Sequence, residues 1–138
     1  MTGFAYPQKV LFQHCDPAGI VFYPRYFEML NATVEAWFEQ RLGHSFARLH
    51  GEVAAGVPTA GLEITFSAPS RLGDDLLFTL WPERLGRSSV GLCFTADCGA
   101  ERRLEMRSTL VFVALADGRP RPWPEALRSA LERERTAG

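Results

Sequence analysis

The chain of 138 residues has no excess of positive charge. Fifteen Lys and Arg residues stand against sixteen Asp and Glu residues, so the formal net charge is −1 and the pI is near 6.3. A clustered basic surface is the electrostatic mark of a protein that binds DNA or RNA. We therefore expect no nucleic-acid partner.

Cysteine is scarce, and the three that occur do not form a metal-binding pattern. Cys15, Cys93 and Cys98 lie in neither a CxxC pair nor a Cys/His spacing typical of zinc sites. Their odd number also argues against a framework of disulfides. A reducing, cytoplasmic location and the absence of a bound metal are the simplest expectations.

Long apolar segments are missing as well. No uninterrupted apolar run approaches the ~18 residues that a membrane-spanning helix needs. The first residues lack the basic region and apolar core of a signal peptide. We expect no membrane partner.

What the sequence does contain is the composition of a globular domain, with 46% hydrophobic and 22% charged residues. Its length predicts one domain over residues 1–138. The clearest predicted element is a helix over residues 24–42, because Pro24 suits a first helical turn and Gly43 a helix end. Apolar residues recur inside it with the helical period, namely Phe27, Leu30, Val34, Trp37 and Phe38.

The remaining elements are short and mostly alternate between apolar and polar residues. We predict strands at residues 9–14, 62–67, 76–81, 87–98 and 103–115, with Pro82 ending the third of them, and a charged helix at 125–135. Strands that follow one another through short turns predict a meander. The fold class is therefore α+β, with an antiparallel five-stranded sheet wrapped around one long central helix. The uncovered sheet face and edges favour a homodimer or a larger assembly.

One stretch, residues 14–27, combines His14, Cys15 and Asp16 with a Pro-x-Gly turn at the start of the long helix. A carboxylate can act as a general base or a nucleophile, and amides at a helix N-terminus can polarise a carbonyl. Alternatively, Asp16 only forms an Asx-turn onto Ala18, a common role for Asp before Pro. The residues alone leave both interpretations open.

The block from Phe12 to Tyr26, which contains Asp-x-x-Gly-Ile-Val-x-Tyr from Asp16 to Tyr23, resembles the hotdog-fold thioesterases, specifically the 4-hydroxybenzoyl-CoA thioesterase-like branch. The resemblance implies hydrolysis of an acyl-CoA thioester at a dimer interface. It implies no cofactor, since coenzyme A is part of the substrate, and a homodimer that often pairs into a dimer of dimers. His14 and Asn31 depart from the hydroxybenzoyl enzyme, so the acyl group is left unassigned.

Carried over by position, the resemblance makes Asp16 the catalytic carboxylate, and it makes the loop from Gly19 to Tyr23 the group that polarises the thioester carbonyl. By this resemblance, the catalytic residues are Asp16, Gly19 and Tyr23. The substrate-binding residues are His14, Ile20, Asn31, Thr59, Arg87 and Ser88, the last two toward the nucleotide end of coenzyme A.

Several alternatives accompany this assignment. His14 is either a second base, a group that orients water or the acyl chain, or a satisfied histidine at a strand end. Cys15 is rejected as a nucleophile because the neighbouring carboxylate disfavours a thiolate, and Glu63 is expected to be a solvated strand residue. A non-catalytic hotdog protein that binds acyl-CoA or acyl-carrier protein is the alternative function, and a hotdog dehydratase fits the His14-Cys15-Asp16 order poorly.

Overall fold

The computed structural model describes residues 3–137. Its main parts are a sheet, a long helix α1 against one face of the sheet, and a C-terminal helix α3. The elements in chain order are β1 (Phe4–Lys9), the 3₁₀ turn η1 (Phe12–His14), α1 (Arg25–Gln40), α2 (Phe46–Arg48), the π-helical turn η2 (Leu49–Val53), β2 (Ala55–Gly56), β3 (Thr59–Phe66), β4 (Asp75–Leu85), β5 (Ser89–Cys98), β6 (Glu101–Val111), β7 (Val113–Ala114) and α3 (Glu125–Ala137). None of the helices within residues 3–137 is long and apolar enough to cross a membrane.

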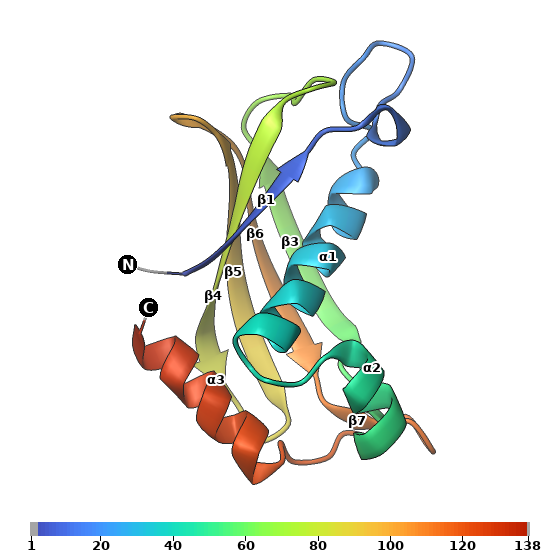
Figure 1. Cartoon of the computed structure of the whole chain (residues 1–138), viewed down its shortest axis with the longest axis vertical. Helices are drawn as coiled ribbons and strands as arrows, with labels where there is room; N and C mark the ends of the chain where they lie inside the picture. Colours follow the sequence, from blue (N-terminus) through green and yellow to red (C-terminus); the bar gives the residue numbers. More distant parts are fainter. Residues whose placement is uncertain (1–2, 138) are drawn as a thin grey trace.

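The five-stranded sheet is antiparallel throughout, with the strand order β1-β4-β5-β6-β3, and it curves around α1 (Figure 1). This is the hotdog architecture, and it confirms the predicted fold class. The predicted long helix is also confirmed. Pro24 caps its N-terminus, and Gly43 adopts a φ of 72° just beyond its end, a conformation that glycine tolerates best.

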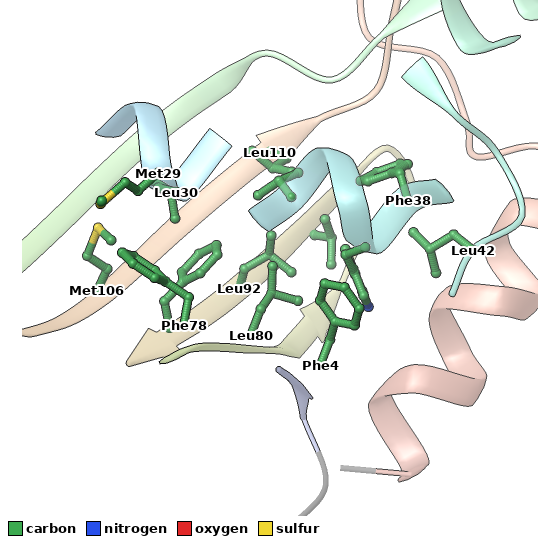
Figure 2. Packing of buried hydrophobic residues seen from close by; sticks show 14 of the residues in the cluster. Phe4, Met29, Leu30, Phe38, Leu42, Phe78, Leu80, Leu92, Met106 and Leu110 are labelled. Carbon is green, nitrogen blue, oxygen red and sulfur yellow. The ribbon is translucent and has the colours of Figure 1, made fainter. Parts of the chain in front are cut away.

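The core lies between α1 and the inward face of the sheet. Phe78, Leu80 and Leu92 from β4 and β5 face Met29 and Leu30 of α1 (Figure 2), and each of the five is at most 4% exposed. Burial of one such side chain stabilises a fold by about 1.5–3 kcal/mol. The apolar side chains that recur every second residue in the strands therefore pack against those that recur every 3.6 residues in α1, and together they form a single apolar layer.

The predicted meander is correct only for β4, β5 and β6. The strand β3 pairs with β6, not with β4, and β1 pairs with the other side of β4. The turns β4–β5 and β5–β6 are short, whereas residues 67–74 separate β3 from β4. An eight-residue link can span roughly 26 Å, enough to cross the roughly 14 Å of three strand spacings.

The predicted first strand, residues 9–14, is wrong in its position. The strand β1 ends at Lys9, which pairs with Asp75, the first residue of β4, so no partner strand continues beyond it. Residues 12–14 form the 3₁₀ turn η1 instead, because the backbone N–H of Leu11 donates to His14 Nδ1 at 2.9 Å and closes the turn. A side chain thus decides where the strand stops.

Two strand ends also differ from prediction. The strand β4 runs through Pro82 to Leu85, with an irregular register between Pro82 and Arg84. Pairing with β1 stops at Leu80, so the missing N–H of Pro82 removes no bond to β1. The predicted strand 103–115 divides into β6 and β7, because Phe112 leaves the ladder and its N–H donates to the carbonyl of Ser88 at 2.7 Å.

The edge strand β3 has apolar side chains that the described chain covers only in part. By register, Leu62 and Phe66 point to the same side as the buried Ser108 and Leu104 of β6. Leu62 is nevertheless 41% exposed and Phe66 46% exposed. This edge therefore combines an open backbone ladder with exposed apolar side chains, the combination that favours pairing with another strand.

An ion pair ties the turn before β4 to β6. Arg103 Nη1 lies 2.7 Å from Asp74 Oδ2, and the same oxygen accepts the backbone N–H of Arg71 at 2.9 Å. The hydrogen bond from Arg103 is the main reason that the pKa of Asp74 lies below its usual value of 3.8, and the Arg71 N–H adds to it.

This lowered pKa predicts a loss of stability in acid. Because the folded state favours the ionised carboxylate, Asp74 stabilises the fold fully above its unfolded pKa, and the contribution is lost as pH falls below about 4. We expect Asp74→Asn to flatten the decrease of the free energy of unfolding between about pH 5 and 3, measured by urea unfolding. The control is Asp75→Asn, whose exposed ion pair with Lys9 is screened by solvent; an equal flattening by both variants would contradict the assignment.

Candidate active site

The loop between η1 and α1 is closed by its own backbone. Cys15 and Val21 form an isolated antiparallel bridge, the N–H of Asp16 donates to the carbonyl of Ile20 at 2.9 Å, and the N–H of Gly19 donates to the carbonyl of Asp16 at 3.0 Å. Gly19 adopts a φ of 80°, which explains a glycine at this turn. The loop therefore presents Asp16 from a defined turn.

The Asp16 carboxylate uses only one of its oxygens inside the described chain. Its Oδ1 accepts the N–H of Ala18 at 2.9 Å, which is the Asx-turn considered from the sequence. Its Oδ2 has no hydrogen-bond partner among residues 3–137, and the side chain is half-buried. The Asx-turn and a chemical role are thus compatible, because one oxygen orients the group and the other stays available.

The start of α1 leaves one backbone donor available beside this loop. The N–H groups of Arg25, Tyr26 and Phe27 donate to the carbonyls of Phe22, Tyr23 and Pro24, respectively, at 2.8–3.1 Å. Pro24 has no N–H, and the N–H of Tyr23 has no partner within residues 3–137. An unpaired N–H at a helix N-terminus is suited to bind a carbonyl oxygen that gains negative charge.

Aromatic side chains form a wall next to Tyr23. The ring centroids of Tyr23 and Phe66 are 6.4 Å apart, those of Tyr26 and Phe66 5.6 Å, and those of Phe22 and Tyr23 5.7 Å. A hollow of about 330 Å³ lies here, lined by Val21, Tyr23, Tyr26, Phe66, Ser67, Ala68 and Pro69. Sequence reasoning missed Phe66 as a site residue, because only the strand order brings the end of β3 to the start of α1.

His14 is placed to donate a hydrogen bond and is poorly placed to act as a base. Its Nδ1 accepts from Leu11, so the neutral ring carries its proton on Nε2. Burial lowers the pKa of His14; Glu28 opposes this shift and Arg25 adds to it. The ring lines a hollow of about 380 Å³ with Glu28 and other residues of β1, η1 and α1, and only 8% of the residue is exposed.

The structure brings part of the predicted site together within one chain. His14, Asp16, Gly19, Ile20 and Tyr23 share the loop at one end of the molecule, seen as the upper blue loop in Figure 1. Ile20 bridges to Arg71 of the neighbouring turn. Asn31 is exposed on α1, eight residues or roughly 12 Å beyond Tyr23.

The other predicted substrate-binding residues lie at the opposite end of the sheet. Thr59 begins β3, seven residues or roughly 23 Å along the strand from Phe66. Arg87 and Ser88 form the turn after β4, roughly 33 Å along that strand from the residue paired with Lys9. One chain therefore does not place them beside Asp16.

Two further candidates, Cys93 and Glu63, lie on the outer face of the sheet. The Cys93 thiol donates to Glu83 on the outer face of the sheet, and burial, followed by this contact, raises the pKa of Cys93 to about 11. Cys15 Sγ lies 3.6 Å from the carbonyl of Leu11, and Glu63 is exposed on the outer face. Within residues 3–137, no three His, Cys, Asp or Glu residues gather in a group that could hold a metal ion.

Several solved structures share this fold over almost their whole length. A 1,4-dihydroxy-2-naphthoyl-CoA thioesterase from Synechocystis has 21% identity and a TM-score of 0.85, with 94% of this chain and 96% of that chain covered. A thioesterase-superfamily protein from Jannaschia has 23% identity and a TM-score of 0.89, with 97% and 94% covered. A gentisyl-coenzyme A thioesterase has 23% identity and a TM-score of 0.84, with 93% and 99% covered.

No curated protein matches the sequence. A family model described as the thioesterase-like superfamily matches residues 10–131, which include the Asp16 loop, α1 and the whole sheet from β3 to β6. The chain belongs to the thioesterase-like superfamily.

Proposed function

We propose that this protein is an acyl-CoA thioesterase that uses Asp16 as its nucleophile or general base. The observation that carries the proposal is that the loop leading into α1 holds two polar groups without a hydrogen-bond partner within residues 3–137, the Oδ2 of Asp16 and the N–H of Tyr23. Membership of the superfamily supports the same chemistry. The similar structures include enzymes named for acyl-CoA substrates.

In the proposed reaction, the thioester carbonyl oxygen accepts the N–H of Tyr23. Asp16 then acts in one of two ways: it attacks the carbonyl carbon directly, forming an anhydride that water hydrolyses, or it takes a proton from the water that attacks. In both routes the C–S bond breaks, coenzyme A leaves as its thiolate and takes up a proton, and the acid is released. A single oxyanion donor of this kind is commonly worth ~10²–10³ in rate.

We further propose that the working unit is a homodimer built through β3. The open edge and exposed apolar side chains of β3 support antiparallel pairing of two copies about a twofold axis. In this arrangement the start of one β3 lies beside the end of the other, so that Thr59 of the partner subunit comes near Phe66. The same rotation carries the end of the second sheet that holds Arg87 and Ser88 toward the Asp16 loop.

A panel of acyl-CoAs tests the function. Purified protein is mixed with aromatic, short-chain and long-chain acyl-CoAs, and release of free thiol is followed with a chromogenic disulfide. The aromatic wall of Tyr23, Tyr26 and Phe66 favours aromatic acyl groups as the first to be tried. Turnover of at least one substrate supports the proposal, whereas binding of acyl-CoA without turnover of any would select the non-catalytic alternative.

A further inference from the structure

We propose that Arg103 is a positioning residue for the Asp16 loop. This inference rests on the proposed function, since it assigns Arg103 a part in thioester hydrolysis. Arg103 lies on β6 and does not belong to the loop. Its effect is transmitted by the turn of residues 69–74, which lies between its guanidinium group and the backbone of residues 19–21.

The guanidinium group holds the turn by several contacts. Arg103 Nη1 donates to the carbonyl of Pro69 at 3.1 Å, to Ser70 Oγ at 3.1 Å and to Asp74 Oδ2 at 2.7 Å. Its Nε lies 2.6 Å from Glu101 Oε1, but the N–H does not point at that oxygen, so this contact is an ion pair without a hydrogen bond. Only 11% of the Arg103 side chain is exposed, and Ser70 is fully buried.

The turn of residues 69–74 holds the Asp16 loop through backbone hydrogen bonds. The N–H of Val21 donates to the carbonyl of Ser70 at 2.9 Å, and the N–H of Leu72 donates to the carbonyl of Gly19 at 3.1 Å. On its other side, the turn exchanges hydrogen bonds with Val10 through the backbone of Gly73 and Asp74 at 2.8–2.9 Å. Gly19 and Val21 flank the Ile20 carbonyl that accepts the Asp16 N–H, so a displaced turn displaces Asp16.

The neighbouring residue Arg102 provides a matched contrast. It lies on the same strand and also carries two ion pairs, to Asp97 at 2.6 Å and to Glu105 at 2.8 Å. Its side chain is 43% exposed, and neither partner belongs to the turn or to the loop. Loss of Arg102 therefore also removes two ion pairs from β6, but it does not loosen the Asp16 loop.

The expected consequence is a selective loss of turnover. Displacement of a catalytic group by about 1 Å can cost up to ~10²-fold in rate. We expect Arg103→Met to lower kcat by about 10–100-fold with KM changed by less than about threefold. Arg103→Lys, which keeps the charge opposite Asp74 but loses the planar fork, is expected to fall between Arg103→Met and wild type. Arg102→Met is expected to keep kcat within about twofold of wild type.

The experiment combines kinetics with hydrogen exchange on the full chain. Kinetics are measured well below the melting temperature of each variant, so that a merely structural role would lower that temperature and leave kcat intact. Exchange of the Val21 and Leu72 amides is measured in parallel, and we expect faster exchange in Arg103→Met but not in Arg102→Met. Unchanged exchange at both amides in Arg103→Met overturns the proposal, whether or not the wild type shows turnover. Absence of turnover in the wild type contradicts only the thioesterase function. An Arg103→Met variant with faster exchange and unaltered kcat overturns the catalytic part of the inference.

Discussion

Replacement of Asp16 by Asn is expected to lower kcat by about 10²–10⁴-fold while the fold stays intact. A carboxylate that acts as a general base or a nucleophile contributes an acceleration of this order, and an amide can do neither. Asn retains the Oδ1 that accepts the Ala18 N–H, so the Asx-turn and the shape of the loop are kept. The measurement is steady-state thiol release from the best acyl-CoA of the panel, with circular dichroism and the melting temperature as checks on folding.

A second aspartate offers a control of the same chemistry and local structure. Asp117 Oδ1 accepts the N–H of Arg119 at 2.9 Å, again two residues further along the chain, in an exposed loop after β7. Asp117→Asn makes the identical atomic change in an equivalent turn and is expected to leave kcat unaltered. If Asp16→Asn behaves like Asp117→Asn, Asp16 is only a turn residue and the proposed mechanism is wrong.

Substitution of Leu62 by Arg is expected to weaken the proposed homodimer by roughly 10²–10⁴-fold. Leu62 is 41% exposed, so burial of the remainder contributes about 0.6–1.2 kcal/mol per copy, and desolvation of the arginine adds about 1–2 kcal/mol. Twofold symmetry places the change in both copies, so the loss is about 3–6 kcal/mol. Turnover at low protein concentration should fall with the dimer, because the residues proposed to hold coenzyme A come from the partner. Sedimentation or light scattering reports the mass, and thiol release reports the activity in the same samples.

The opposite face of the same strand provides the control for this prediction. Thr65→Arg introduces the same charge into β3, but by register Thr65 lies across from Glu105 on the outer face. We expect this variant to stay dimeric and active. Recovery of Leu62→Arg activity at high protein concentration would separate dissociation from misfolding. A wild-type chain that is monomeric and fully active would show that β3 is not the interface that the site needs.

Local patterns explain why the sequence predicted α1 and the Asp16 loop well. Residues three and four apart on a helix share a face whatever surrounds it, so the apolar period of α1 and its end at Gly43 are readable without a partner. The Asp16-to-Tyr23 spacing is equally local, since it places a carboxylate, a glycine turn and a helix start within eight residues.

Contacts between distant segments could not be read from the chain in this way. The order β1-β4-β5-β6-β3 depends on how an eight-residue link crosses the sheet, and the end of β1 depends on the His14 ring bonding to Leu11. The role of Phe66 beside Tyr23 and of Arg103 behind the turn depends on that order. The sequence suggested Thr59 and Arg87 as neighbours of the site, whereas one chain places them at the far end of the sheet.

The sequence by itself therefore determined the helix, the turn of the Asp16 loop and the alternating faces of most strands, because these depend on backbone geometry over a few residues. Only the tertiary structure decided which strands adjoin, which donors and acceptors at the start of α1 stay available, and which arginine supports the loop. These properties arise when groups far apart in the chain compete for the same hydrogen-bond partners and the same buried space. The Asp16 loop belongs to both categories, since its residues are encoded locally and its position is held by a turn some fifty residues away.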